Sequence, residues 1–378
     1  MRVLVAPDSF KGSMTAAEAA AGIDRGLRAS SRGREVEIDP CPIADGGEGT
    51  LDTLLAADPT GEVREVEVTG PLGERRVARW GSLAGGTVGV VELAEAAGLT
   101  LVHASRRDPT MTTTRGVGEL IAAAIEDGVE RVVLGLGGSA TNDGGAGAAQ
   151  VLGVTFHRAD GSAIDEPMRG GLHDEVATVD GAALHPALRD GRVTLEAACD
   201  VTNPLCGSNG AAAVYGPQKG ATPAQVAALD AGLARLAEVV GVSGAFAGAG
   251  AAGGFGYGAV ALLGGRLRPG IELVLEAVGF ERRVAAADVV ITGEGRLDGQ
   301  SLSGKAAAGV AGMAQRAGRP CVAFAGSVAA DRAALEGVGI TETVSIGDGL
   351  SVAEAMRRGP ELIERAATLW ADRALTGG

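Results

Sequence analysis

The chain has 378 residues, of which 46% are hydrophobic and 21% charged, a balance typical of globular proteins. Because single hydrophobic cores stop growing near roughly 250 to 300 residues, two domains are expected. The net charge of −14 argues against binding to nucleic acid or to anionic membranes, and no segment approaches the roughly 20 apolar residues of a membrane span. A soluble cytoplasmic protein that holds any phosphate with local groups is therefore expected.

The cysteine and glycine residues indicate which kinds of binding site to expect. The four cysteines form no CxxC pair, which predicts reduced thiols and neither a zinc site nor a disulfide framework. Glycine occupies 62 positions, often beside acidic and hydroxyl residues. This clustering indicates turns in which the backbone approaches a ligand, although a compositional bias of the source genome would explain part of it.

The N-terminal part alternates strands and helices. Residues 2–7 form a predicted strand, residues 15–27 a helix with a capping box at Thr15 and Glu18, and residues 35–39 a second strand. A glycine-rich loop at 45–50 then opens a helix over 51–56. Residues 63–91 change to short alternating segments, which predict hairpins and a domain boundary nearby.

The middle of the chain returns to the α/β pattern, with a predicted helix over 116–127, a strand over 131–136 and a helix over 146–152. Weak periodicity over 157–190 predicts surface loops before a strand at 193–198. Residues 244–258 predict a tight ordered loop. Strands at 288–292, 321–326 and 343–347 and a final amphipathic helix complete the chain.

The two chain ends resemble each other more than either resembles the hairpin region. They predict a Rossmann-like parallel sheet domain formed by residues 1–65 and 285–378, with a second α/β domain, residues 66–284, inserted between them. The active site is expected in the cleft between these domains. The unit around 131–152 could belong to either domain.

Ligands bind beyond the carboxyl ends of parallel strands, so residues that follow the predicted strands are the site candidates. After the first strand come Asp8, Ser9 and Lys11, where the lysine can hold a phosphate; an incidental solvated turn is the alternative. At the next turn, Asp45 and Glu48 flank glycines at a helix start. These carboxylates either act as caps or lie near a metal-bound phosphate or a substrate hydroxyl.

The turn after residues 131–136 reads GLGGSATNDGG. It matches a dinucleotide fingerprint formally, but the acidic residue expected about 20 positions later is missing, so NAD binding is rejected. Backbone N–H groups and hydroxyls at a strand-to-helix turn favour an anion instead. The phosphate or substrate candidates here are Gly137, Gly138, Ser139, Thr141, Asn142 and Asp143.

Two further strand ends carry candidates. Asp200 and Asn203 follow the strand at 193–198. Asp200 could act as a base or as a magnesium ligand, and the alternative is that it only forms a turn before Pro204. Lys219 lies in a later Gly/Pro turn. After the strand at 288–292 the segment TGEGRLDGQS packs charges beside glycines; its candidates are Glu294, Arg296, Asp298 and Ser301. A Walker A loop at 299–305 is rejected because Ala306 replaces the magnesium-binding hydroxyl residue.

The strings APDSFKGS, ADGGEGT, GLGGSATNDGG, ACDVTNPLCG, YGPQKGAT, GAAGGFGYG, RPGIELVLE and TGEGRLDGQS occur in this order along essentially the whole chain. Together they resemble the type I glycerate kinase family. The resemblance implies phosphorylation of D-glycerate by ATP with Mg²⁺, most often to 2-phosphoglycerate, in organic-acid catabolism. We expect Asp200 to be the base, Lys11 and Arg296 to steady the phosphoryl group and substrate carboxylate, and Asp45 to join the Mg²⁺ shell.

Other functions stay open at this stage. The alternatives are a kinase of another small hydroxy acid and a non-catalytic sensor of nucleotides or sugar acids, although a sensor need not keep acidic and basic residues in every turn. The expected partners are D-glycerate and ATP, without nucleic acid or membrane. The oligomeric state is open, a homodimer being one alternative.

Overall fold

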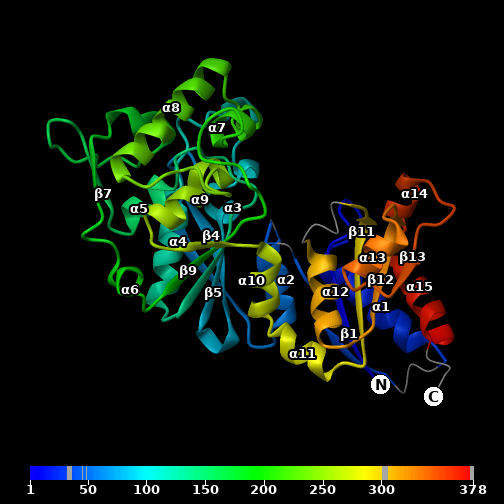
Figure 1. Cartoon of the computed structure of the whole chain (residues 1–378). Helices are drawn as coiled ribbons and strands as arrows, with labels where there is room; N and C mark the ends of the chain where they lie inside the picture. Colours follow the sequence, from blue (N-terminus) through cyan, green and yellow to red (C-terminus); the bar gives the residue numbers. More distant parts are fainter. Residues whose placement is uncertain (32–35, 45, 48, 300–304, 375–378) are drawn as a thin grey trace. The chain divides into compact units, whose positions relative to one another are not determined.

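We describe the protein from a computed structural model, which covers residues 1–378 except 32–35, 45, 48, 300–304 and 375–378. The chain divides into two compact units (Figure 1). Unit 1 comprises Met1–Asp45, Asp52–Pro59 and Val274–Gly378, and unit 2 comprises Gly46–Leu51 and Thr60–Leu273. Among the helices that the structure describes, none combines the length and hydropathy that a bilayer-spanning segment needs.

Unit 1 contains a fully parallel sheet of five strands, in the order β13-β12-β11-β1-β2. Strand order reverses at β1, between its neighbours β2 and β11, as it does at the switch point of doubly wound flavodoxin-like sheets. The strands are β1 (Arg2–Pro7), β2 (Glu37–Pro40), β11 (Val289–Leu297), β12 (Cys321–Val328) and β13 (Glu342–Ser345).

Helices cover this sheet because its central strands are apolar on both faces. Val3, Leu4 and Val5 of β1 are all fully buried. The amphipathic helices α1 (Ala16–Ala29) and α15 (Gly359–Ala374) pack together, and Ile23 and Ile363 belong to the same core as Val3 and Val5. The predicted capping box of α1 is confirmed.

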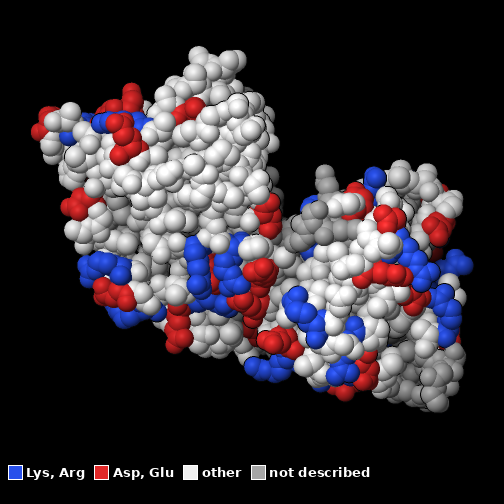
Figure 2. Space-filling model, in the orientation of Figure 1, with Lys and Arg blue, Asp and Glu red and all other residues white. Residues whose placement is uncertain are grey.

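Helix α11 (Phe280–Ala286) precedes β11 in the chain, and α12 (Ala306–Arg316), α13 (Arg332–Gly337) and α14 (Val352–Arg357) follow β11, β12 and β13 in turn. Helices α2 (Thr50–Ala57) and α10 (Gly270–Ala277) each contain one of the points at which the chain passes from one unit to the other. On the face of unit 1 drawn in Figure 2, acidic and basic side chains are interspersed. This face therefore presents no large area of one charge sign that would attract anions in general.

Unit 2 contains a mixed sheet of six strands, in the order β10-β9-β6-β5-β4-β3. The predicted hairpins are confirmed, because β3 pairs antiparallel with β4 and β4 with β5, whereas β5, β6, β9 and β10 are parallel. The strands are β3 (Glu62–Thr69), β4 (Arg75–Leu83), β5 (Val88–Glu92), β6 (Arg131–Gly135), β9 (Thr194–Ala198) and β10 (Arg266–Arg268).

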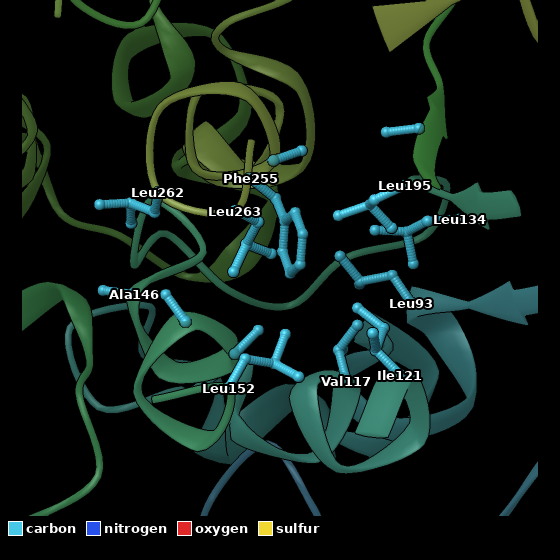
Figure 3. Packing of buried hydrophobic residues seen from close by; sticks show 14 of the residues in the cluster. Leu93, Val117, Ile121, Leu134, Ala146, Leu152, Leu195, Phe255, Leu262 and Leu263 are labelled. Atoms are coloured by element: carbon cyan, nitrogen blue, oxygen red, sulfur yellow. The ribbon is translucent and has the colours of Figure 1, made fainter. Parts of the chain in front are cut away.

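Aliphatic side chains and a few aromatic ones fill the core of unit 2. Figure 3 shows Leu134 and Leu195 of the sheet facing Val117, Ile121 and Phe255 of the helices. The helices are α3 (Leu93–Ala97), α4 (Arg115–Glu126), α5 (Ala146–Val151), α6 (Pro186–Arg189), α7 (Ala211–Tyr215), α8 (Pro223–Val240) and α9 (Ala251–Ala261). The segment predicted as surface loops, residues 157–190, includes the short pair β7 (Thr155–His157) and β8 (Thr178–Asp180).

The structure corrects two predicted elements. The segment 244–258 was predicted to be a loop, but its second half belongs to α9, whose first residues include left-handed Ala252, Gly253 and Gly254. Strand β11 was predicted to end at Thr292, but it continues to Leu297. The charged residues and glycines of that stretch are typical of a turn, which is why the sequence predicted one. In the structure, its backbone pairs with β12, which continues to Val328, and this pairing satisfies the backbone hydrogen-bonding groups.

Two glycine-rich strings of the sequence pack directly against each other in unit 2. The Gly144 N–H donates to the Gly253 carbonyl oxygen at 3.1 Å. A side chain at Gly253 would collide with the carbonyl oxygen of Thr141, and its φ of +71° disfavours any other residue. The start of α9 therefore supports the turn after β6 by backbone contact.

We expect Gly253→Ala to destabilise unit 2 through both strain and collision. The matched control is Gly161→Ala, since Gly161 has a φ of +84° but nothing within 4 Å of an added Cβ. Urea unfolding should show Gly253→Ala to be at least about 1 kcal/mol more destabilising than the control, because overpacking adds to the shared backbone strain. Equal losses would contradict the close contact.

Candidate functional site

A cavity of about 440 Å³ opens in unit 1 at the carboxyl ends of β1, β11 and β12. It lies where the strand order reverses, which is where parallel α/β sheets bind their ligands. Its walls are the loop after β1, the end of β11, the loop after β13 and helix α14. Most charged residues of the lining come from the loop after β1 and the end of β11, whereas most apolar ones come from residues 346–356; we call these two sets the charged half and the apolar half.

The charged half comes from the loop after β1, from the end of β11 with the residue after it, and from Lys305 at the start of α12. Its side chains are Asp8, Lys11, Glu294, Arg296, Asp298 and Lys305. The Asp8 N–H donates to the Gly293 carbonyl oxygen at 2.8 Å, which ties the two segments together. Arg296 lies 3.3 Å from Asp298, and its side chain is 67% exposed. This exposed guanidinium is accessible to an incoming anion.

The carboxylates of this half fit a magnesium ion that arrives with a phosphate. Asp8, Glu294 and Asp298 all line the cavity, yet within the described residues no three acidic, His or Cys side chains form a ready-made metal cage. Mg²⁺ is usually held by one or two protein carboxylates plus substrate phosphate oxygens. Asp45, the predicted magnesium ligand, lies outside the described residues.

The turn after β6 is built around a buried carboxylate. Asp143 is fully buried and accepts hydrogen bonds from the Thr114 N–H and hydroxyl at 2.8 and 2.7 Å, and from the N–H groups of Gly145 and Gly147. Burial raises the pKa of Asp143, and these hydrogen bonds oppose the rise. Its carboxylate thus organises the turn from within.

Lys219 supports the same turn from below the surface. It is only 2% exposed, and its Nζ donates to the Ser139 hydroxyl at 2.7 Å and to the Thr141 carbonyl oxygen at 2.6 Å. Burial lowers the pKa of Lys219 to about 7. Beside it, the Thr141 hydroxyl and both Asn142 side-chain polar atoms are buried with no hydrogen-bond partner in the part of the chain that is described.

The loop after β9 lies at the same sheet edge, because β9 pairs with β6 and Ala198 is in register with Gly135. Asp200 is exposed, and its Oδ1 accepts from the Gly270 N–H at 3.0 Å at the start of α10. Both polar atoms of the Asn203 amide have partners: Nδ2 donates to the Asn209 carbonyl oxygen within the loop, and Oδ1 accepts from the hydroxyl of Tyr215 in α7. Asp200 is thus the more accessible of these two polar side chains.

Residues 3–374 match the family model of the glycerate kinases. The chain belongs to the glycerate kinase family. It is 44% identical to a glycerate kinase of Halalkalibacterium halodurans over 97% of this chain and 96% of that protein, and 42% identical to the glycerate 2-kinase of Escherichia coli over 95% and 94%. The crystal structure of a "putative glycerate kinase 2" from Salmonella typhimurium LT2 matches with a TM-score of 0.87 and 40% identity, covering 100% of this chain and 99% of that one.

Family membership confirms the resemblance and makes the protein a kinase. The structure gathers the predicted site residues into separate groups. The unit 1 cavity brings together Ser9, Lys11, Glu294, Arg296 and Asp298. The turn after β6 brings together Gly137, Gly138, Ser139, Thr141, Asn142, Asp143 and, from outside the turn, Lys219. Asp200 and Asn203 share the loop after β9, and Ser301 lies outside the described residues.

Sequence reasoning missed three features of these sites. Lys305 lines the cavity although the Walker A pattern around it was rejected. The apolar half of the cavity comes from residues 346–356, which carry no charged motif. Glu92 ends β5, is 6% exposed and accepts from the Leu51 N–H at 2.8 Å. An acidic residue that closes an apolar run was the available signal for Glu92.

We expect Lys219→Met to change how stability depends on pH. The pKa of Lys219 is about 7 in the folded protein, against 10.5 for a free lysine. Between these values the unfolded chain binds a proton that the folded protein does not. The free energy of unfolding should therefore rise with pH, by up to about 1.4 kcal/mol per pH unit, and the variant should lack this rise.

Urea unfolding between about pH 7 and pH 9.5 measures this dependence, since the difference arises from the folded-state pKa upward. The matched control is Lys11→Met, which removes an exposed lysine and should keep the pH dependence of the unaltered protein. The same pH dependence in Lys219→Met and in the unaltered protein would contradict the lowered pKa.

Proposed function

We propose that the protein transfers the γ-phosphoryl group of ATP to the 2-hydroxyl of D-glycerate, as a cytoplasmic enzyme of organic-acid catabolism. Membership of the glycerate kinase family supports the reaction, and the name of the Escherichia coli relative, glycerate 2-kinase, supports 2-phosphoglycerate as the product. All four cysteines are free thiols, as in proteins of a reducing compartment.

The observation that carries the proposal is the cavity at the switch point of unit 1. Its volume of about 440 Å³ is in the range of sites for nucleotide-sized ligands. Lys11, Arg296 and Lys305 supply positive charge at one side of it. Phosphoryl transfer depends mainly on positioning and charge neutralisation, so this half suits the triphosphate of ATP.

Magnesium would be held in the same half. Asp8, Glu294 and Asp298 are the carboxylates available there, and Asp45 is the further ligand that we expect from the sequence. When bound, Mg²⁺ neutralises charge on the β- and γ-phosphates. The protein's own contribution is to orient the triphosphate with Lys11 and Arg296.

The acceptor is assigned to the strand ends of unit 2. There Asp200 offers an exposed carboxylate that can take the proton of the glycerate hydroxyl. The turn at 135–145 offers Gly137 and Gly138 backbone and the buried hydroxyl of Ser139. Because Lys219 is engaged beneath that turn, we assign it to positioning the turn rather than to direct contact with phosphate.

Incubation with ATP, Mg²⁺ and D-glycerate tests the reaction. Coupled detection of ADP measures turnover, and NMR of the product identifies the carbon that is coupled to phosphorus. Coupling through carbon 2 is expected. Coupling through carbon 3 would reject the proposed position, and turnover with other small hydroxy acids but not with glycerate would favour the alternative kinase.

Asp200→Asn separates the proposed base from its structural role. The asparagine oxygen can still accept from the Gly270 N–H, so helix α10 keeps its cap, but the side chain no longer accepts a proton. We expect kcat to fall by roughly 10²- to 10⁴-fold. The melting temperature should stay close to that of the unaltered protein.

Asp200→Ala is the companion variant. It should lose a similar amount of activity and in addition about 1 kcal/mol of stability, because the cap is removed too. Wild-type turnover in Asp200→Asn with loss of stability only in Asp200→Ala would show that Asp200 serves as a cap and not as the base.

A further inference from the structure

We propose that the apolar half of the unit 1 cavity holds the nucleobase of the phosphoryl donor. We define this base wall as Ile346, Leu350, Val352, Ala355 and Met356, which line the cavity from the loop after β13 and from helix α14. The proposal rests on the proposed function, since it names the part of the same site that recognises the donor. It adds a specificity element that none of the charged motifs contains.

Two residues of the base wall expose apolar surface that the fold of unit 1 leaves uncovered. Val352 is 76% exposed and Met356 38% exposed, although both are large hydrophobic residues. Single exposed apolar residues are ordinary, but these two belong to one continuous lining with Ile346 and Leu350. A surface of this kind inside a cavity is suited to a flat apolar ligand face.

The chain ties the base wall to the charged half. The Ser13 hydroxyl donates to the Met356 carbonyl oxygen at 2.7 Å, and Ser13 lies two residues after Lys11. The Met356 side chain also packs so close to Gly12 that a side chain at position 12 would displace it. The loop that presents Lys11 and the helix that presents Met356 therefore keep a fixed spacing.

A nucleotide matches a cavity with a charged half and an apolar half better than glycerate or inorganic polyphosphate does. Glycerate is a small anion with no extended apolar face, so it would leave the base wall unused. Inorganic polyphosphate would use only Lys11, Arg296 and Lys305. A nucleoside phosphate joins a polyanion to a flat base whose faces gain from apolar contact, as the two halves of the lining require.

The experiment compares the binding of ADP and of pyrophosphate by calorimetry, which does not depend on turnover. Val352→Asp places a charge in the base wall at an exposed position, where folding should tolerate it. We expect it to weaken ADP binding at least tenfold and to change pyrophosphate binding by less than threefold. Met356→Ala should weaken ADP binding in the same direction with a smaller effect.

The matched control is Leu369→Asp, because Leu369 is 59% exposed on α15 and does not line the cavity. This variant should bind ADP and pyrophosphate as tightly as the unaltered protein does. The proposal is overturned if the unaltered protein binds ADP no more tightly than pyrophosphate, or if Val352→Asp weakens both ligands equally or neither. ADP binding that depends on Val352 without phosphorylation of glycerate would reject the proposed function while leaving the base wall in place.

Discussion

The parallel pairing of β1 with β11 is the constraint on which the site in unit 1 depends. It brings together segments nearly 290 residues apart, with Val3 in register with Val289 and Pro7 with Gly293. Because both strands run in the same direction, the loop that carries Lys11 and the strand end that carries Arg296 open on one edge. The buried residues of β1, α1 and α15 hold that pair in a common core. Neither charged segment would form a site without this pairing.

In unit 2, close backbone packing holds the candidate site segments in place, as strand pairing does in unit 1. The turn after β6 is held by Gly253 of α9 on one side, by Lys219 on another, and by Asp143 within. Polar residues in such a turn therefore divide into two kinds. Asp143 and Lys219 are buried, and their polar atoms form hydrogen bonds within the protein. Asp200, on the neighbouring loop, has an exposed side chain. Chemistry that needs contact with a substrate is better assigned to the second kind.

Under the proposed function, the cavity of unit 1 is where an acidic protein would bind a highly charged nucleotide. The net charge of −14 offers no general attraction for an anion. Local cations at strand ends, backed by an apolar wall, concentrate the favourable interactions in a small volume. Carboxylates in the same half, Asp8 and Asp298 among them, would oppose a bare triphosphate and suit one that carries a cation. Binding is then expected to depend on the form in which the nucleotide arrives.

The sequence by itself determined most of the strand and helix pattern, the parallel sheet of the chain ends, the hairpins over 63–91 and the strings that identify the family, because periodicity and local motifs are properties of neighbouring residues. It also located Lys11, Arg296 and Asp200 just beyond or near strand ends. Only the tertiary structure decided that β11 runs on to Leu297, since a strand's length depends on its partner. Only the fold, likewise, revealed that Lys219 is buried and that Val352 faces a cavity. Burial and strand pairing depend on residues that are far apart in the chain, so a local sequence pattern does not predict them.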